Sequence, residues 1–532
     1  MLLFSISIGF FLIYSLYKSK KAMHMLQQNY YDESNRYLFW MFKNLKKVFG
    51  NIDILLILAS IMLMFVNINN DIKVILYSLL AFIVFVLYYK KEKKEQVKKP
   101  LVITARIKRL LVTQIIVYFI PIILFLINYD SEKIGLYYLI LSSMVYLSYF
   151  IVLFGNYINK NTVEKLVYLS FKTKAMKKLK SMNLPVIGIT GSYGKTSSKN
   201  IINDILSVKF NSFATPKNFN TPYGMIRSIN NHLDKFNDLF IAEMGAFKIG
   251  EINSICKMMK PTHGVLTTIG EAHLESFGSR ENIQKGKFEL IESLPSGGIA
   301  ILNGDDEWQV NYKLKNSKCR VLWTGIDNQD ADIVALNIKL SGNGTNFDVK
   351  FKGDDNLYNF NTRLLGKHNV YNLLAGILLG KELGMNINEL KRGVSSVKTI
   401  EHRLELKKSG TLNIIDDAYN SNPVGSKMAL DVLKLMPGTK IVVTPGMIEL
   451  GDKQYELNKK FGEYIADSSD YVILVGKEQT KPIYDGLLEC NYNKDKIYVI
   501  NDVVDAFSIM NRINDGNTYI LLENDLPDLF NE

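Results

Sequence analysis

Cysteine is scarce in this chain of 532 residues, and the three that occur stand far apart, at Cys256, Cys319 and Cys490. Their spacing fits neither a zinc site nor a disulfide framework. Few, scattered cysteines are typical of proteins in a reducing compartment. We assign these three cysteines no role. The sequence also lacks internal repeats and low-complexity tracts, and its length alone predicts several domains.

Features of a cleaved signal peptide are missing at the amino terminus. The first apolar run, from Met1 to about Tyr17, has no basic residue ahead of it and no small-residue cleavage site behind it. We therefore expect this run to remain as an anchor. Together with four later runs that approach the roughly 20 residues needed to cross a bilayer, it predicts a multi-pass membrane region of about five helices. The later runs are Ile54 to Ile68, Ile72 to Tyr89, Leu110 to Asn128 and Ile134 to Gly155.

Positive charge is concentrated near these runs, and the whole chain carries a net charge of +12. Basic residues cluster after the first run and after the third, whereas the other two connections are short and nearly neutral. Because basic loops stay on the cytoplasmic side, we expect the amino terminus outside and everything after Gly155 in the cytoplasm. The lysines that follow, between Lys172 and Lys180, are better explained by attraction to anionic lipid than by binding of nucleic acid.

The rest of the chain alternates between strand-like and helix-like segments. Strands are expected at Leu184 to Thr190, Leu239 to Glu243, Gly264 to Thr268 and Ile299 to Asn303, with helices between them. This alternation favours a parallel sheet covered on both faces. A second series begins near Arg403 and resembles a Rossmann-like domain. Its expected strands are Leu412 to Asp416, Lys440 to Thr444, Tyr471 to Val475, Lys496 to Ile500 and Thr518 to Leu522.

The strongest local motif is Gly188-Ile-Thr-Gly191-Ser-Tyr-Gly194-Lys195-Thr196-Ser197. Glycines between a strand and a helix let backbone N–H groups face a phosphate, and the helix N-terminus adds positive potential. A lysine and a hydroxyl then serve phosphate and magnesium. The spacing departs from the usual P-loop, since Ile189 stands where its first glycine would be. The alternative is a plain glycine turn with an exposed lysine.

At this motif the sequence resembles the Mur ligase family, and further family blocks follow in order. The resemblance covers about residues 186 to 450 and is greatest to the D-alanyl-D-alanine-adding branch. The blocks are Thr215-Pro-Lys-Asn-Phe-Asn-Thr221, Glu243-Met-Gly-Ala246, Ile269-Gly-Glu-Ala-His273, Lys285-Gly-Lys287-Phe-Glu289, Asn303-Gly-Asp-Asp306, Gly366-Lys-His-Asn369-Val-Tyr-Asn372, His402-Arg403 and Asp416-Asp417-Ala-Tyr-Asn420.

The resemblance implies a fold and a domain order. We expect a membrane α-helical region at 1–160, a basic linker helix at 161–183, a central P-loop ATPase domain of α/β type at 184–399 and a C-terminal Rossmann-like domain at 400–532. It also implies an ATP-dependent carboxylate–amine ligase that forms an acyl phosphate with the help of Mg²⁺.

Site residues are implied by the same resemblance. The catalytic set is Lys195, His273, Lys287 and Arg403. The ATP-binding set is Gly191, Ser192, Gly194, Lys195, Thr196, Ser197, Asn369, Asn372, Arg403 and Asp417. Magnesium is expected near Thr196, Glu243, His273 and Lys287, of which Lys287 resembles the family's carbamylated lysine; Lys285 is the alternative. The substrate set is Asn218, Asn220, Thr221, Tyr419 and Asn420. Closure of the C-terminal domain on the central one is expected to complete the site.

Two departures from the family leave the substrate open. The soluble domain that grips the uridine diphosphate sugar is replaced by the apolar runs, and Leu522-Glu523-Asn524 stands where a Lys-Gly-Ser segment is usual. The expected partners are ATP, a cell-wall precursor that is soluble or lipid-linked, an amino acid or dipeptide, and membrane lipid, without nucleic acid. Three functions compete: a ligase acting on a muramyl peptide, a ligase of another polymer such as poly-γ-glutamate, and a non-catalytic scaffold for cell-wall enzymes.

Overall fold

A computed structural model describes the chain as two compact units, residues 1–172 and 173–532, each of which is treated by itself. The described residues are 2–29, 31–32, 36–49, 52–93, 100–217, 219–315, 318–341, 344–399, 402, 404–418, 421–448 and 450–524.

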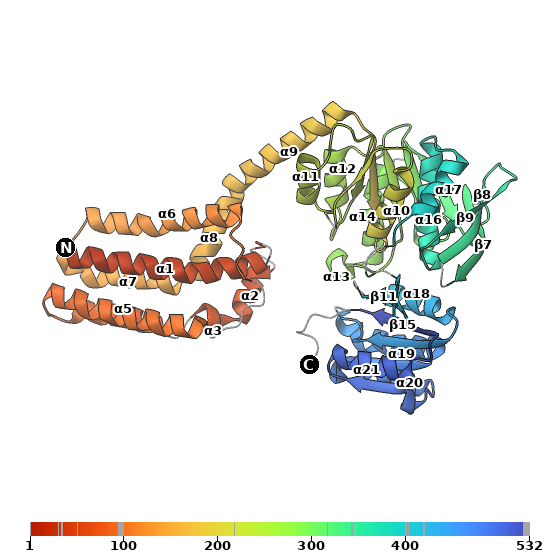
Figure 1. Ribbon diagram of the computed structural model, residues 1–532. Helices are drawn as coiled ribbons and strands as arrows, with labels where there is room; N and C mark the ends of the chain where they lie inside the picture. The colour runs from red at the N-terminus through yellow and green to blue at the C-terminus, as the bar shows by residue number, and fades with distance from the viewer. Residues whose placement is uncertain are drawn as a thin grey trace. The chain divides into compact units, whose positions relative to one another are not determined.

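The first unit is helical (Figure 1). Tyrosine and phenylalanine side chains fill much of its interior: Phe4, Phe11, Tyr14, Tyr77 and Tyr138 are all buried. The helices are α1 Leu2–Gln28, α2 Leu38–Lys43, α3 Leu45–Val48, α4 Ile54–Phe65, α5 Asn70–Lys93, α6 Ala105–Ile127, α7 Ile134–Tyr146, α8 Ser148–Asn161 and the start of α9 Val163–Met182, with a 3₁₀ turn at Ser131–Lys133.

Two helices among the described residues, α5 and α6, are long and apolar enough to cross a membrane. A bent pair, Ser131–Tyr146 with Ser148–Met182, adds a third if its two helices, which meet at 73°, form one broken span. The prediction of five spans is therefore not supported. Helix α4 has 12 residues and is about 18 Å long, against a hydrocarbon core of roughly 30 Å. Helix α1, which holds the first predicted run, is not among the helices that are long and apolar enough to cross a membrane.

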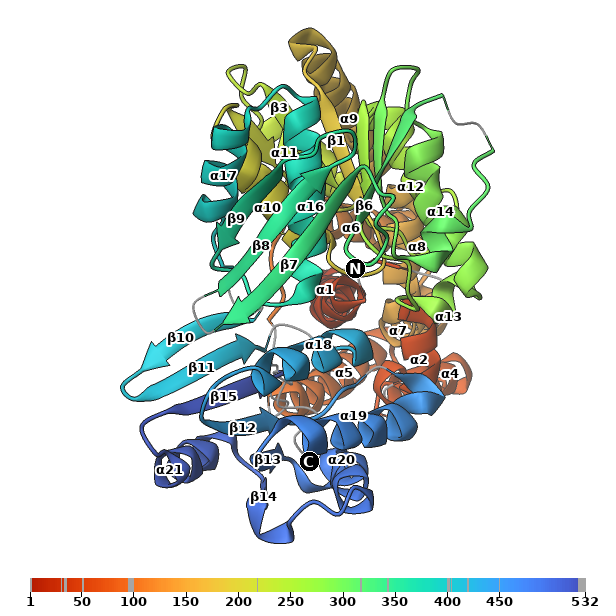
Figure 2. The ribbon, with the colours of Figure 1, turned by 90° about the vertical axis from the view of Figure 1, so that its right-hand side faces the viewer.

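The second unit begins with a nine-stranded sheet in the order β2-β3-β1-β4-β5-β6-β7-β8-β9. The first seven strands in this order pair in parallel, as predicted, and β7, β8 and β9 form an antiparallel extension that the sequence analysis did not foresee (Figure 2). The strands are β1 Val186–Thr190, β2 Ser212–Ala214, β3 Leu239–Glu243, β4 His263–Leu266, β5 Ile299–Asn303, β6 Arg320–Gly325, β7 Ile333–Ser341, β8 Gly344–Phe351 and β9 Leu357–Thr362.

Helices cover both faces of this sheet, which explains why its central strands are continuously apolar. Ile187 and Ile189 belong to one core cluster with Ile201 and Leu373, from the covering helices on that face. Gly188 faces the other way, where a Cβ atom would lie 2.6 Å from Leu290 of α14. The helices are α10 Lys195–Leu206, α11 Pro222–Asn231, α12 Glu251–Met259, α13 Leu274–Phe277, α14 Arg280–Glu292, α15 Glu307–Val310, α16 Lys367–Glu382 and α17 Ile387–Ser396.

A six-stranded sheet follows in the order β10-β11-β15-β12-β13-β14, with β10 antiparallel and the others parallel. Both faces are apolar, and α18, α19 and α20 cover one face while α21 covers the other. The strands are β10 Glu405–Ser409, β11 Leu412–Asp417, β12 Thr439–Thr444, β13 Tyr471–Val475, β14 Ile497–Ile500 and β15 Thr518–Glu523; the helices are α18 Pro423–Lys434, α19 Gln454–Ser468, α20 Lys477–Glu489 and α21 Val503–Ile513, with 3₁₀ turns at Gly451–Lys453 and Lys494–Lys496.

Candidate active site

The phosphate-loop motif joins the buried strand β1 to helix α10, as its sequence predicts. Gly191 adopts a φ of +153°, and a Cβ atom there would lie 2.0 Å from Thr267 Oγ1. Gly194 caps α10 with a φ of +77°. Both glycines are therefore required by the backbone path, which any larger side chain would strain. The N-terminus of α10 opens directly behind them.

Neighbouring segments fix the shape of this loop. Ser192 N donates to Thr268 O at 2.7 Å, and Ser192 Oγ donates to Gly270 O at 3.0 Å. Thr267 Oγ1 donates to Tyr193 O at 2.5 Å. The strand-to-helix turn is thus pinned by the segment that follows β4. Such pre-organisation reduces the ordering cost of binding an anion.

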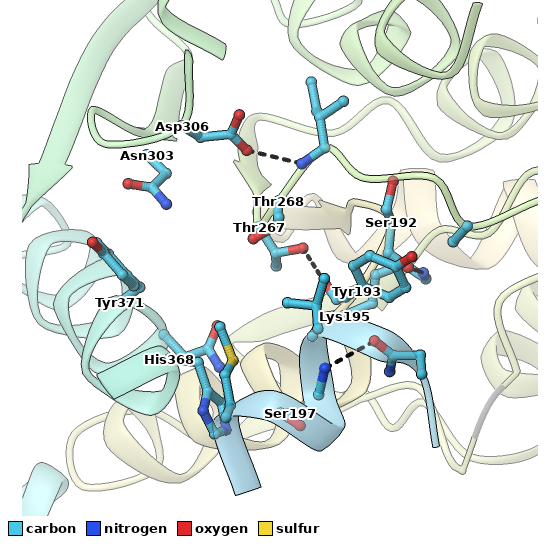
Figure 3. Close-up of a pocket in the computed structure, with 18 of the residues that line it drawn as sticks. Ser192, Tyr193, Lys195, Ser197, Thr267, Thr268, Asn303, Asp306, His368 and Tyr371 are labelled. Atoms are coloured by element: carbon cyan, nitrogen blue, oxygen red, sulfur yellow. Dashed lines mark hydrogen bonds between the residues drawn. The ribbon is translucent and has the colours of Figure 1, made fainter. Parts of the chain in front are cut away.

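Lys195 bends back over its own loop. Its Nζ donates to Gly191 O at 2.8 Å and to Ser192 O at 2.9 Å. Figure 3 shows Lys195 beside Ser192 and Tyr193. The ammonium therefore lies at the loop, where an incoming phosphate would meet it and the N-terminus of α10 together.

A buried carboxylate, Glu243, stands at the end of β3 with an exposed fraction of 1%. Its Oε1 accepts hydrogen bonds from Thr196 Oγ1 at 3.1 Å and from Asn220 Nδ2 at 3.2 Å. Its Oε2 lies 3.2 Å from the ammonium of Lys199. The structure thereby joins three residues that the resemblance assigns to metal and substrate with Lys199, which the sequence analysis did not single out.

His273 is the N-cap residue of α13, with a left-handed φ of +62°, and its ring lies 4.5 Å from that of Phe247, centroid to centroid. Its pKa is lowered from the ordinary value, first by partial burial and then by the positive charges of Lys195 and Lys287. A neutral imidazole is therefore favoured, which is the form that can bind a metal.

Lys287 is buried in α14, with an exposed fraction of 1%, whereas Lys285 is exposed. The Lys287 Nζ donates a long hydrogen bond to Ala246 O at 3.4 Å. Burial, followed by repulsion from Lys195, lowers the pKa of Lys287 to about 7. Lys287 is thus held where it can be neutral near physiological pH.

An open cavity of about 760 Å³ adjoins the phosphate loop. Lys195 and Thr196 line it together with His273, Asn369 and Asn372. Further lining residues come from β11, from α18 and from the N-cap of α18, namely Asp417, Asn422, Val424, Gly425 and Met428. In Figure 3, His368 and Tyr371 stand across the cavity from Tyr193 and Lys195. Glu243 and Lys287 do not belong to the lining and lie deeper in the protein.

Asn369 and Asn372 are tied to the frame of the cavity. Asn369 Nδ2 donates to Leu365 O at 2.8 Å, and Ser198 Oγ donates to Asn372 Oδ1. The second contact links α10 to α16. Asn369 is therefore oriented by its own helix start, while Asn372 positions the phosphate-loop helix.

Asp417 ends β11 at the cavity, and its Oδ1 accepts a hydrogen bond from Leu404 N at 3.1 Å. In register on the neighbouring strand β15 stands Glu523, which has an exposed fraction of 1%. Glu523 Oε1 accepts hydrogen bonds from Ser421 Oγ and Ser426 Oγ, each at 2.8 Å. Burial, and next the charge of Asp417, raise the pKa of Glu523 well above its usual range.

Comparison with known proteins decides the family. Residues 189–380 match the Mur ligase middle domain, and residues 402–522 match the glutamate ligase domain of Mur ligases. UDP-N-acetylmuramoyl-tripeptide--D-alanyl-D-alanine ligase of Bacillus subtilis is 33% identical over 323 residues, 60% of this chain and 68% of that protein. Its Escherichia coli counterpart is 30% identical over 55% of this chain and 65% of its own length. This chain thus spans about two thirds of these relatives.

This chain belongs to the Mur ligase family. Membership makes it an acid–amino-acid ligase. The crystal structure of the Mur ligase MurF from Thermotoga maritima in complex with ADP has a TM-score of 0.60 at 26% identity, covering 67% of this chain and 80% of that one. MurF from Acinetobacter baumannii shares the fold with a TM-score of 0.60 at 24% identity, over 67% of this chain and 77% of its own.

Four of the implied Mur ligase residues lie outside the described part of the chain: Asn218, Arg403, Tyr419 and Asn420. Of the others, Thr221 caps α11, where its side chain accepts a hydrogen bond from Gly224 N at 3.2 Å. Sequence reasoning missed Lys199 and passed over Glu523, which it noted only as a departure from the family. A charged residue on the apolar face of α10 was the available signal for Lys199.

The oxygen chemistry around Glu243 fits the Mg²⁺ that the family implies. Among the described residues, no group of three or more His, Cys, Asp or Glu side chains could hold a metal alone. Mg²⁺, however, is usually held by one or two carboxylates together with phosphates and water. Glu243 Oε2 is buried without a hydrogen bond, and the Thr196 hydroxyl adjoins the same carboxylate. These two residues suit such a site.

The raised pKa of Glu523 predicts a pH-dependent stability. Between the unfolded pKa near 4.5 and the higher folded pKa, the folded protein binds the extra proton, so the free energy of unfolding falls as pH rises through that window. Glu523→Gln should remove this fall and leave the variant more stable than the wild type at pH 8. Urea unfolding at pH 5 and pH 8 measures the change in the free energy of unfolding, with a substitution of an exposed residue, Glu456→Gln, as the matched control. An equal change with pH in Glu523→Gln and in the wild type would show that Glu523 is not the group responsible.

Proposed function

We propose that this Mur ligase uses ATP to activate a carboxylate of a muramyl peptide or related cell-wall precursor, and joins it to D-alanyl-D-alanine or a similar amine. The observation that carries the proposal is the junction of the phosphate loop with a buried carboxylate. Thr196, beside Lys195 at the start of α10, contacts Glu243 at 3.1 Å. The named activity of the Bacillus and Escherichia relatives supports the substrate class.

The first half-reaction is transfer of the terminal phosphoryl group of ATP to the substrate carboxylate, which gives an acyl phosphate and ADP. Lys195 and the backbone N–H groups of the loop bind the phosphates, and their positive potential offsets the charge that accumulates during transfer. Mg²⁺ bound by Thr196 and Glu243 would supply further charge neutralisation. Asn369, Asn372 and Asp417 hold the nucleoside end of ATP in this proposal, since they line the same cavity.

The second half-reaction is attack by a neutral amine on the acyl carbon. The new C–N bond forms as the C–O bond to phosphate breaks, and the proton lost by the amine passes to phosphate or water. The C-terminal domain supplies Asn422 and Gly425 to the cavity wall, so we place the amine on that side. In this proposal Arg403 contacts the phosphates, and Tyr419 and Asn420 lie where the amine approaches. Asn218, Asn220 and Thr221 belong to the substrate site.

The apolar helices suggest where the reaction takes place. Helices α5 and α6 are long and apolar enough to cross a bilayer, and they expose large apolar side chains such as Leu79, Ile83 and Ile120. Exposed apolar area of this kind marks a membrane or protein interface. We propose that this region holds the ligase domains at the cytoplasmic membrane face, beside a lipid-linked or membrane-associated acceptor. The division into a membrane region, a linker helix and two ligase domains belongs to the same proposal.

A substrate panel tests this function. Full-length protein in lipid nanodiscs, with Mg²⁺ and bicarbonate, is given soluble or lipid-linked muramyl tripeptide together with D-alanyl-D-alanine or L-glutamate, and ADP release is measured. We expect release to require a muramyl peptide and D-alanyl-D-alanine, and Lys195→Ala to lower it at least about 100-fold, the scale of one lost charge-stabilising group. Release with glutamate alone would support polymer synthesis instead, and no release with any pairing would support the scaffold.

Lys287 is proposed to carry a carbamate formed with carbon dioxide. The neutral amine adds to carbon dioxide and loses a proton, which turns a cationic side chain into an anionic one. Because the pKa of Lys287 is about 7, the reactive amine increases as pH rises through that value. Protein incubated with ¹³C-bicarbonate should show a ¹³C carbamate resonance that grows from pH 6 to pH 8. The resonance should vanish in Lys287→Arg and persist in Lys285→Arg; the opposite pattern would move the site to Lys285.

A further inference from the structure

Lys199 is a buried cation that the proposed reaction has not used. It lies in α10, one helical turn beyond Lys195, with an exposed fraction of 1%. Its ammonium is 3.2 Å from Glu243 Oε2 and also donates to the backbone oxygen of Lys217. Burying a charged pair is costly and rarely the most stabilising choice. Stability alone therefore does not account for the burial of this ammonium.

The contacts of Glu243 divide its carboxylate into two ends. Oε1 accepts the hydrogen bonds of Thr196 and Asn220, both neutral side chains. Oε2 has no hydrogen-bond partner among the described residues and lies in ionic contact with Lys199. The Glu243–Lys199 pair is thus electrically neutral as a unit. A divalent cation approaching Oε2 therefore meets the carboxylate together with an ammonium that lies 3.2 Å from the same oxygen.

Coulomb's law then sets the condition for metal binding. The attraction of the cation to one carboxylate is largely cancelled by repulsion from an ammonium a few ångströms away, and burial strengthens both terms. An incoming anion, such as the phosphates of ATP bound at the adjacent loop, restores the net attraction. The cation then binds favourably only when the anion is already present.

The second contact of Lys199 lets the pair adapt. Lys217 adopts a left-handed φ of +48° in the segment after β2, and its carbonyl oxygen points to the ammonium. When a cation occupies Oε2, the ammonium keeps this acceptor and need not be left unsatisfied. The same contact ties α10 to the segment that holds Asn220.

We propose that Lys199 is a positioning residue that makes divalent-cation binding at Glu243 conditional on a bound anionic ligand. The inference rests on the metal site of the proposed function. In the nucleotide-free protein the ammonium neutralises Glu243 and excludes the cation. With phosphates at the loop, the cation binds between them and Glu243. Free Mg²⁺ therefore does not occupy the site ahead of the nucleotide.

Mn²⁺ titration of nucleotide-free, full-length protein in nanodiscs tests this role, because bound Mn²⁺ loses its free-ion electron paramagnetic resonance signal. The wild type should bind no Mn²⁺ at this site, whereas Lys199→Gln, which keeps a donor for Lys217 O without the charge, should gain a site. The Mn²⁺ affinity of Lys199→Gln should exceed that of the wild type by a factor on the order of ten or more. Lys199→Arg, which keeps the charge, should behave as the wild type, and adding Glu243→Gln to Lys199→Gln should abolish the new site.

Thermal unfolding gives a second measurement that does not depend on catalysis. Mn²⁺ should raise the melting temperature of Lys199→Gln or Lys199→Met more than that of the wild type, because it replaces the missing positive charge. Equal Mn²⁺ affinity and equal melting shifts in wild type and variants would overturn the proposal. Since no substrate is present, an intact Mn²⁺ contrast together with failure of the ADP-release panel would count against the proposed function alone.

Discussion

A buried carboxylate cannot stay charged without compensation, and Glu243 meets that constraint by gathering its surroundings. Two chain segments supply its partners: the phosphate-loop helix provides Thr196 and Lys199, and the segment after β2 provides Asn220. The strand β3 that carries Glu243 pairs directly with β1, which leads into the phosphate loop. A single side chain consequently places the loop relative to the oxygens proposed to bind metal and to the segment proposed to bind substrate.

Positive charge is the second organising feature. Burial, and next the charges of Lys195 and Lys287, lower the pKa of His273; burial, and next the charge of Lys195, lower the pKa of Lys287. A site with this excess of cations is poorly stabilised when empty and is favourable for phosphates and carboxylates. The buried pair at Lys199 and Glu243 stays neutral within it. Charge placement thus prepares the site for anions first and for a divalent cation second.

Much of the fold could be predicted because its signals are local. The strand β1, the glycine loop and α10 follow from apolar β-branched residues, two glycines with positive φ and a helical pattern. The antiparallel extension β7 to β9 was missed, since its strands carry many polar residues and lie between two family motifs, the one that ends at Asp306 and the one that begins at Gly366. Five spans were predicted from apolar runs alone, whereas the structure shows a short α4 and a bend between α7 and α8 that hydropathy does not reveal.

The candidate site shows the same division. Resemblance to the family's motifs predicted Lys195, Thr196, Glu243 and His273, and the structure shows that Lys287 is buried whereas Lys285 is exposed. Lys199 and Glu523 could not be found by spacing, because their importance comes from partners 44 residues away on β3 and 106 residues away on β11. Only the paired strands and the helix above them reveal those contacts.

Oxygen transfer tests the central claim, activation of a carboxylate by ATP at this site, most directly. The muramyl peptide is labelled with ¹⁸O in its reacting carboxylate, and the products are analysed by ³¹P NMR and mass spectrometry. The account predicts that one ¹⁸O atom appears in inorganic phosphate for each amide formed, with ADP as the other product. Label found in AMP, or amide formed without transfer of label to phosphate, would contradict it.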